Sequence, residues 1–169
     1  MKPRILGPWF IAMLFAVLVF LPSSAHAGMT PAEVKAFNDI KAKAENGDAS
    51  SQSLLGYYYN NGLGVAKNNV HAVNWFRKAA AQGDAYAQFI LGVRYAIGDG
   101  VPKDEIEAYA YLIIAGTTNA DARKYLPTLK RQMSSGKIAT GQKRAKELQK
   151  EIEATLAAKK AEDEKKASK

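Results

Sequence analysis

The sequence predicts an all-α protein: a right-handed α-solenoid of stacked helix-turn-helix units, closed by a capping helix at its C-terminal end. Two observations support this fold. A unit recurs at an offset of 36 residues without a gap, since 13 of 34 positions are identical when 47–80 is aligned with 83–116. In each copy, an N-cap residue begins a stretch of helical periodicity that a Gly-x-Gly turn ends. The shared positions with a packing or turning role are Leu55/Leu91, Gly56/Gly92, Tyr59/Tyr95, Gly62/Gly98 and Gly64/Gly100.

Residues 1–27 are predicted to be a signal peptide. Lys2 and Arg4 precede an uncharged apolar run over 5–21, and Ala25-His26-Ala27 places small residues at −3 and −1 of a peptidase site. We therefore expect cleavage after Ala27 and a periplasmic location. The alternative is an uncleaved anchor in the inner membrane, because the 17-residue apolar run would span about 25 Å as a helix.

Residues 28–46 are expected to form the lone helix of a partial leading repeat. Thr30 and Glu33 have the spacing of a capping box, and Pro31 occupies the first helical position, where it is well tolerated. The periodicity predicts that this helix ends near Glu45.

Two full helix-turn-helix units are predicted over 47–82 and 83–118. In the second unit Asp84 is placed to cap the first helix, while Asp104 and Glu107 have the spacing of a capping box for the second helix.

Two glycines fall in the middle of predicted helices. Gly56 and Gly92 each cost about 1 kcal/mol relative to alanine, a penalty explained if two helices approach too closely for a Cβ atom. Small residues on the second helices are suitable partners: Ala72, Ala79, Ala108 and Ala115.

Beyond the second unit the repeat pattern fades. Residues 119–136 predict a partial repeat helix, and 137–156 an amphipathic capping helix with Ala145, Leu148 and Ile152 on one stripe. Residues 157–169 contain no large apolar side chain, so we expect a charged, frayed and solvated tail. The alternative for this tail is an electrostatic contact with anionic lipid or an acidic partner.

These repeats resemble the Sel1-like repeat family, helical solenoids related to tetratricopeptide repeats. The resemblance rests on SQSLLGYYYNNGLGVAKNNVHAVNWFRKAAAQGDA (51–85) and AQFILGVRYAIGDGVPKDEIEAYAYLIIAG (87–116), which carry the Leu-Gly, Tyr, Gly-x-Gly-Val and Ala-Ala positions. It implies a non-catalytic scaffold, adaptor or regulator of an envelope complex or sensor. Some cysteine-rich members are linked to β-lactam binding, which cannot transfer to a chain with no cysteine.

The net charge of +8 divides unevenly along the chain. The signal peptide carries +2, residues 28–136 carry +2, and residues 137–169 carry +4. Export, more than charge, argues against a nucleic-acid partner.

The sequence offers little that could carry catalysis, so we expect no enzyme activity, metal or cofactor. Without cysteine there is no thiol nucleophile or thiolate metal site. His71 is the only histidine after the signal peptide and has no second ligand at helical spacing. Asp99, in Gly-Asp-Gly, falls far short of a calcium loop.

A second apolar stripe on the first helices is the better candidate for function. Opposite the predicted core stripe, these helices carry five residues that we expect to bind a partner's segment: Tyr57, Asn61, Tyr86, Phe89 and Val93. The alternative is that the neighbouring repeat or the terminal helices cover this stripe. The expected partner is another envelope protein. Peptidoglycan is the rival, in a cell-wall glycan-binding or cell-wall-modifying factor.

Overall fold

The computed structural model describes residues 30–168, so the predicted signal peptide at 1–27 lies outside the described residues. All regular elements within this range are α-helices. Their bounds are α1 Pro31–Glu45, α2 Ala49–Asn61, α3 Asn69–Ala80, α4 Ala85–Ile97, α5 Glu105–Ala115, α6 Ala120–Gln132 and α7 Ser135–Ala167.

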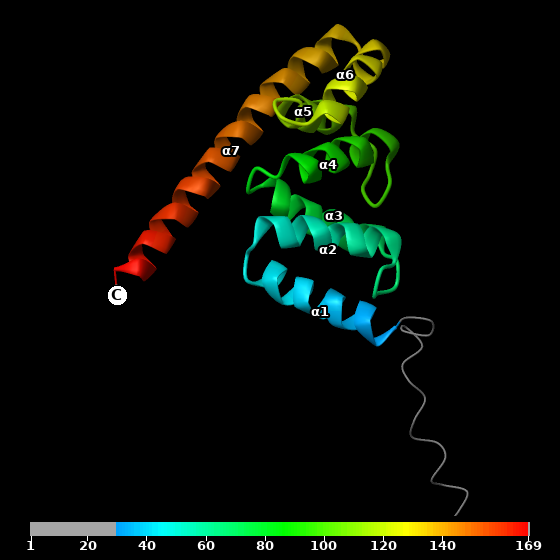
Figure 1. The fold of residues 1–169 in the computed structure, drawn as a ribbon. Coiled ribbons are helices and arrows are strands. Elements are labelled where there is room, and N and C mark those ends of the chain that lie inside the picture. Colours follow the sequence, from blue (N-terminus) through cyan, green and yellow to red (C-terminus); the bar gives the residue numbers. More distant parts are fainter. Residues whose placement is uncertain (1–29, 169) are drawn as a thin grey trace, which may run out of the picture.

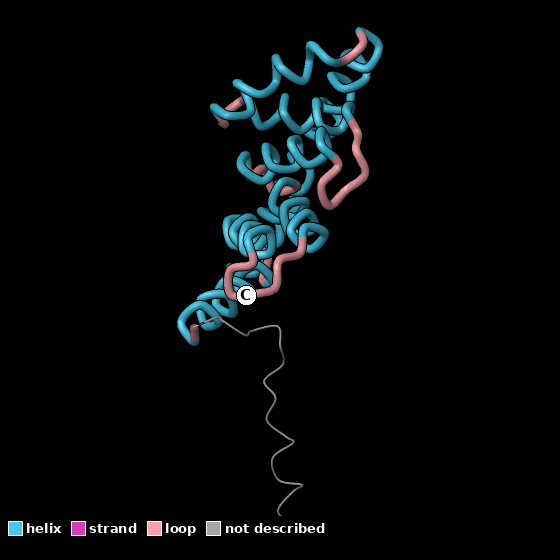
Figure 2. The backbone as a smooth tube through the Cα atoms, turned by 90° about the vertical axis from the view of Figure 1, so that its right-hand side faces the viewer, coloured by secondary structure: helices cyan, strands magenta, loops and turns pink. Residues whose placement is uncertain are grey.

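Helices α1 to α5 stack as successive layers (Figure 1), and the view turned by 90° shows the same layering (Figure 2). Packing is closest within the pairs α2–α3 and α4–α5, which are the two predicted helix-turn-helix units. Helix α7 packs on α5 and runs diagonally along one side of the stack. The predicted all-α stack with a C-terminal capping helix is therefore confirmed.

Local capping sets the helix ends. The side chains of Asp48, Asp84 and Asn68 each accept a hydrogen bond from a backbone N–H in the first turn of their helices. Gly62 and Gly98 end α2 and α4 in the left-handed region, at φ 73° and 77°, where a side chain would be strained.

One predicted cap is wrong in part. Asp104 accepts from the backbone N–H of Ile106 and Glu107, as expected of an N-cap. The Glu107 carboxylate, however, accepts a hydrogen bond of 2.7 Å from Arg144 Nε on α7 instead of one from the Asp104 backbone. A charged donor on another helix outcompetes the reciprocal half of the capping box.

The paired helices meet at their mid-helix glycines. A Cβ atom on Gly92 would lie 2.7 Å from Leu112 Cγ, and one on Gly56 would lie 2.9 Å from Phe76 Cδ1. Both distances are shorter than van der Waals contact allows, so glycine is required where α2 meets α3 and α4 meets α5. The four predicted small partners, Ala72, Ala79, Ala108 and Ala115, are all fully buried. The side chains nearest to the two glycines, however, are those of Phe76 and Leu112.

The matching leucines of the two units lie in the core. Leu55 and Leu91 are both 0% exposed, so neither repeat position can contact a partner. Leu55 packs in a cluster with Phe37 of α1, whereas Leu91 packs in the cluster that α3 forms with α4. Tyr59 and Tyr95 are partly buried against this second cluster. Each leucine therefore ties the first helix of its unit to the helix that precedes it.

The second glycine of each turn also lies in close contact with the helix of the preceding unit. Gly64 and Gly100 have φ 65° and 75°, as expected of these turns. A Cβ atom on Gly100 would also lie 2.6 Å from the Asn69 carbonyl oxygen on α3, and one on Gly64 would lie 2.8 Å from the Glu33 carbonyl oxygen on α1. The interpretation of Gly100 as a turn residue alone is therefore incomplete, because contact with the preceding unit also excludes a side chain there.

Helix α7 differs from its prediction at both ends. It begins at Ser135, capped by the Ser134 side chain, and continues to Ala167, so the predicted frayed tail after 157 is wrong. The last turns remain fully solvated, as expected. Alanine, lysine and glutamate favour helix, and ion pairs such as Lys166–Glu162 at 2.6 Å support it.

The apolar stripe of α7 caps the last full unit. Ala145, Leu148 and Ile152 are buried against Ala110 and Ile114 of α5. Farther along α7, the Lys159 ammonium donates to the Gly47 carbonyl at 3.1 Å and to Gln82 Oε1 at 2.6 Å. The helix therefore also reaches the loops that precede α2 and α4. Within residues 30–168, no helix has the length and hydrophobicity needed to cross a membrane.

The glycine at the α4–α5 contact provides the first prediction. Replacing Gly92 by alanine should lower the free energy of unfolding by about 1–2 kcal/mol, because overpacking against Leu112 outweighs the gain in helix propensity. The matched control is Gly136→Ala in α7, where a Cβ would meet nothing within 4 Å. Urea denaturation followed by circular dichroism measures both. Equal stability of the Gly92 variant and the native chain would contradict the close-approach explanation.

A partly buried tyrosine beneath α7, Tyr111, provides a pH-dependent prediction. Burial raises the pKa of Tyr111 from 10.0 to about 12, with smaller contributions from Tyr95 and Glu107. The folded chain therefore holds this proton more tightly than the unfolded chain, and the stability is lost as the pH rises from 10 toward 12. When the pH is raised from about 9 to about 11, the free energy of unfolding of Tyr111→Phe should fall by about 1 kcal/mol less than that of the native chain. Urea denaturation at each pH measures both values. If the variant and the native chain lost the same stability over this pH range, Tyr111 would not be the cause of the pH dependence.

Candidate functional site

The first helices of the two units present one face away from their buried stripes. At about 100° per residue, one helical stripe of α2 holds Ser50, Leu54, Tyr57 and Asn61, all of them exposed. The equivalent stripe of α4 holds Tyr86, Ile90, Val93 and Ile97, of which Tyr86 and Ile97 are exposed. The apolar stripe predicted from the sequence runs through Phe89 in place of Ile90, and on α4 it is exposed only at its two ends, Tyr86 and Ile97.

A concave site lies where the first parts of these stripes meet. It has a volume of about 390 Å³ and is lined by Ser50, Ser53, Leu54, Tyr57, Asp84 and Tyr86. We call it the tyrosine groove. Tyr57 and Tyr86 remain 40% and 42% exposed, so each aromatic ring has a free face.

Contacts between helices position the walls of the tyrosine groove. The Asp84 carboxylate accepts from the Ala87 backbone N–H at 2.7 Å and from Ser53 Oγ at 3.0 Å, and so it joins α2 to the start of α4. The Tyr86 ring packs edge-on against buried Phe76, with ring centroids 6.2 Å apart. Burial raises the pKa of Tyr86, and Tyr57 and Asp84 add to this shift. The hydroxyl is therefore neutral at physiological pH and available as a hydrogen-bond donor.

The five predicted partner-binding residues do not all lie together. Tyr57 and Tyr86 line the tyrosine groove, whereas exposed Asn61 lies at the far end of α2 and donates to the Tyr57 carbonyl at 2.8 Å. Val93 is half-buried. Phe89 packs against the cluster formed by α5 and α6, so neighbouring helices do cover this part of the stripe. Partner binding by these residues stays a prediction.

Two features of this face were missed from the sequence. Leu54 lines the groove and is 42% exposed. Its spacing of three residues from Tyr57 was the signal that could have identified it. The other feature is buried Arg94, whose guanidinium binds both the Asp99 carboxylate and the Asn60 side chain.

Arg94 belongs to a polar network that joins the two units. Asn69 Nδ2 also donates to Asp99 at 2.6 Å, so side chains of both units converge on the Arg94–Asp99 pair. The aligned positions in the first unit are Tyr58 and Leu63. The second unit has an arginine and an aspartate where the first unit has two uncharged residues. This paired difference could have indicated the ion pair from the sequence.

The chemistry of the face favours binding. Within residues 30–168, no cluster of three or more His, Cys, Asp or Glu side chains has the arrangement of a metal site. His71 is exposed on α3, edge-on to Tyr59 with centroids 5.2 Å apart. The carboxylate of the tyrosine groove, Asp84, is already engaged as a helix cap. The aromatic rings, Leu54 and Ser50 remain to contact a ligand, because the Ser53 hydroxyl already donates to Asp84.

Comparison with known families agrees with this architecture. The model of the Sel1 repeat matches residues 49–84 and 85–117. The chain contains two Sel1 repeats. Each matched Sel1 segment begins two residues after the start of the predicted units, 47–82 and 83–118, so the register differs only slightly.

Solved structures of Sel1 repeat proteins show the same fold. The protective antigen c5321 of uropathogenic Escherichia coli, described as having an SLR fold, is 26% identical, with a TM-score of 0.69 over 76% of this chain. A Sel1 repeat protein from Oxalobacter formigenes is 37% identical, with a TM-score of 0.56 over 57% of this chain. The chain spans 28% of the length of each. No curated protein matches it.

These similarities confirm the predicted right-handed helical solenoid and the Sel1-like assignment. Sel1 repeats are generally protein–protein interaction modules, and solenoids of this kind are generally non-catalytic scaffolds.

The network around Arg94 provides a prediction for this Sel1 array. Replacing Arg94 by lysine should lower the free energy of unfolding by about 1–2 kcal/mol, because a single ammonium cannot reproduce the planar fork between Asn60 and Asp99. Arg131→Lys, at an exposed position on α6, is the matched control and should change stability by less than about 0.5 kcal/mol. Thermal and urea unfolding provide the measurement. A neutral Arg94 variant would indicate that the network contributes no stability.

Proposed function

We propose that this protein is a non-catalytic interaction module that binds a segment of a partner protein in the tyrosine groove. The observation that carries this proposal is the pair of half-exposed residues, Tyr57 and Tyr86, which line a concave site together with half-exposed Leu54. Tyrosine is enriched at protein interfaces because it combines a large apolar surface with a hydroxyl and few rotatable bonds.

The arrangement suits a short peptide segment better than a large flat surface. The volume of about 390 Å³ accommodates one or two side chains, and exposed Ser50 also lines the groove. Beyond the groove, exposed Ile97 continues the apolar stripe of α4. A partner segment lying along α4 would place its anchor between the tyrosines and a second apolar residue near Ile97.

We further propose that the protein acts in the periplasm as a scaffold, adaptor or regulator of an envelope complex or sensor. This part rests on the basic, apolar and small-residue order of residues 1–27, which is that of a secretory signal peptide. The partner is then another envelope protein.

The second candidate function is binding of cell-wall glycan. The observation in its favour is the same groove, since tyrosine faces stack on sugar rings and the Ser50 hydroxyl can form a hydrogen bond. Hydrolysis is not part of this candidate, because glycoside cleavage needs two placed carboxyl groups and the groove has only Asp84 among its lining residues.

Affinity capture from an envelope extract tests the groove. The double variant Tyr57→Ala, Tyr86→Ala should recover at least about tenfold less partner than the native chain does, because two anchor side chains are removed. The matched control is Leu63→Ala, Val70→Ala, which removes two exposed apolar side chains outside the groove. Circular dichroism checks that both variants remain folded.

The outcomes separate the two candidates. Equal recovery of the same proteins by the native chain and the tyrosine variant would overturn the groove proposal. Recovery of peptidoglycan fragments in place of proteins would support the glycan candidate.

Export has a separate test. Mass spectrometry of the protein purified from cells should find an N-terminus at Gly28, after removal of residues 1–27. Retention of Met1 would overturn the proposal of a cleaved periplasmic protein. It would support the alternative, in which the uncleaved N-terminal segment anchors the protein in the inner membrane.

A further inference from the structure

The basic residues of this chain are concentrated in one part of the fold. Residues 120–150, which form α6 and the first half of α7, contain nine basic and two acidic residues, a net charge of +7. Residues 30–119 contain eight basic and nine acidic residues, and 151–168 contain four and five. Both flanking parts therefore carry −1, and the charge is a property of the capping end and not of the whole tail.

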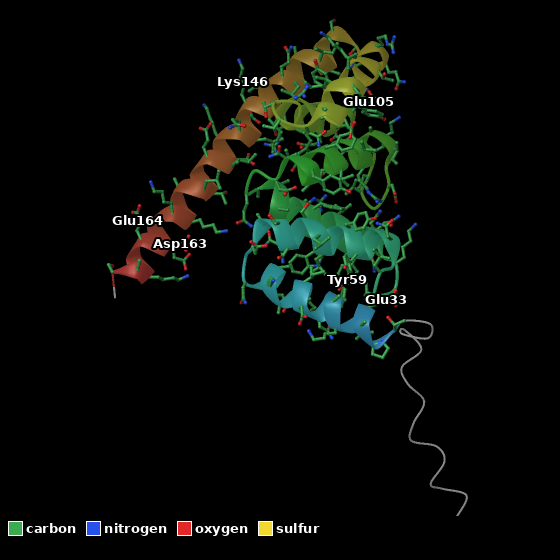
Figure 3. All side chains as sticks on the ribbon, in the orientation of Figure 1. Glu33, Tyr59, Glu105, Lys146, Asp163 and Glu164 are labelled. Carbon is green, nitrogen blue, oxygen red and sulfur yellow. The ribbon has the colours of Figure 1, made fainter. Side chains whose placement is uncertain are left out.

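Three of these nine basic residues face solvent along one line of α7. The buried stripe of α7 is Gly141, Ala145, Leu148 and Ile152. The opposite side carries Lys143, Lys146 and Lys150, all exposed, with Glu147 at its margin. Figure 3 shows Lys146 projecting from the first half of α7.

Two other cations of the segment, Arg144 and Lys137, are already paired with carboxylates. Arg144 lies between Glu107 at 2.7 Å and Glu151 at 2.9 Å, and Lys137 binds Glu105 at 2.7 Å. By contrast, Lys146 and Lys150 form no salt bridge with any residue in 30–168, and Lys143 approaches Glu147 only at 4.0 Å. The three lysines of the stripe are therefore available to an external anion.

A largely apolar cavity lies between α5 and α7 and meets this lysine stripe at Lys146. It has a volume of about 660 Å³ and is lined by Tyr109, Ile113, Ile114, Thr117, Gln142, Ala145, Lys146 and Gln149. We call it the cap groove. The α5 side and Ala145 provide an apolar floor, and Gln142, Lys146 and Gln149 provide a polar rim on α7.

We propose that the cap groove is a second docking site, which binds an acidic protein segment that carries an apolar anchor. The anchor side chain enters between α5 and α7, while flanking carboxylates meet Lys143, Lys146 and Lys150. The rim amides of Gln142 and Gln149 match the donors and acceptors of a peptide backbone. This site shares no lining residue with the tyrosine groove, so the inference does not depend on the function proposed for that groove.

The spacing of the lysines limits the form of the segment. Lys143 and Lys150 are seven residues apart, which is about 10 Å along a helix. Carboxylates on an extended partner would match this distance about three residues apart, and those on a helical partner about seven residues apart.

A protein segment fits the observations better than a membrane surface does. Membrane-surface helices place apolar side chains outward, where they enter the acyl boundary. Here Ile114 is 6% exposed and Ala145 3% exposed, so the apolar floor is recessed behind a polar rim. A single protruding side chain can reach it, whereas the plane of a bilayer cannot.

Peptide selection on the purified full chain tests this proposal. The probes are 12-residue peptides from a random display library, selected in parallel on the native chain and on the Lys143→Glu, Lys146→Glu, Lys150→Glu variant. Peptides enriched on the native chain should pair Asp or Glu with a Leu, Ile or Phe anchor. Fluorescence anisotropy should show the best peptide binding the variant at least about tenfold more weakly, the combined effect of three exposed ion pairs.

Matched variants distinguish binding at the cap groove from nonspecific attraction of acidic peptides to a basic surface. Lys160→Glu, Lys165→Glu, Lys166→Glu makes the same charge change on the outer part of α7 and should leave the affinity within about twofold. Thr117→Trp obstructs the cap groove without changing charge and should weaken binding at least about tenfold. Raising the salt from about 0.1 M to about 1 M shortens the screening length from about 10 Å to about 3 Å and should weaken binding of the native chain.

Each other outcome overturns the proposal. Selected peptides without acidic enrichment, or with equal affinity for both lysine variants, would exclude a specific basic site. Binding to phosphatidylglycerol vesicles that the Lys143, Lys146 and Lys150 changes abolish, with no acidic peptide selected, would assign the stripe to a membrane. If the Tyr57→Ala, Tyr86→Ala variant alone lost the peptides, the binding would belong to the tyrosine groove.

Discussion

The close approach of paired helices is the constraint on which the rest of this structure depends. Gly56 lets α2 contact Phe76 of α3, and Gly92 lets α4 contact Leu112 of α5 at distances that no Cβ atom could share. This packing sets one face of each first helix inward and therefore turns the opposite face outward. The tyrosine groove exists because two such outward faces are stacked one repeat apart, with Asp84 joining them through Ser53.

Helix α7 converts the open end of the array into a second surface. By burying Leu148 and Ile152 against α5, it covers a face that a further repeat would otherwise occupy. The same docking turns its lysine stripe outward and leaves the cap groove beside α5. The two grooves therefore have different chemistry: aromatic and hydroxyl-lined near the first repeat, apolar with a cationic rim at the capping end. A module with two such sites is suited to holding two protein segments at a fixed separation.

Much of the fold and part of the site were predictable from the sequence, and the failures share a cause. The caps at Asp48 and Asp84, the turn glycines and the outward stripe with Tyr57 and Tyr86 follow from spacing within one repeat. Phe89 was assigned to the surface because its own helix gives no sign of α6, which packs near it. Gly100 was assigned only to its turn because the Asn69 carbonyl that excludes its Cβ belongs to the preceding unit. Glu107 was assigned to a capping box because Arg144, its actual partner, is 37 residues away in sequence.

The sequence by itself determined the repeat, the helix ends and the residues that face away from each helix core, because these depend on local backbone geometry and on periodicity. Only the tertiary structure decided which outward residues remain accessible, which charges are neutralised and where a cavity forms. Those properties depend on the path of α6 and α7 relative to the repeats. That path is set by side-chain packing between segments far apart in the chain, such as Gly141 against Tyr109 and Lys159 against the Gly47 loop. The net charge of +7 at the capping end therefore follows from the sequence alone, whereas its placement beside an apolar cavity is a consequence of the fold.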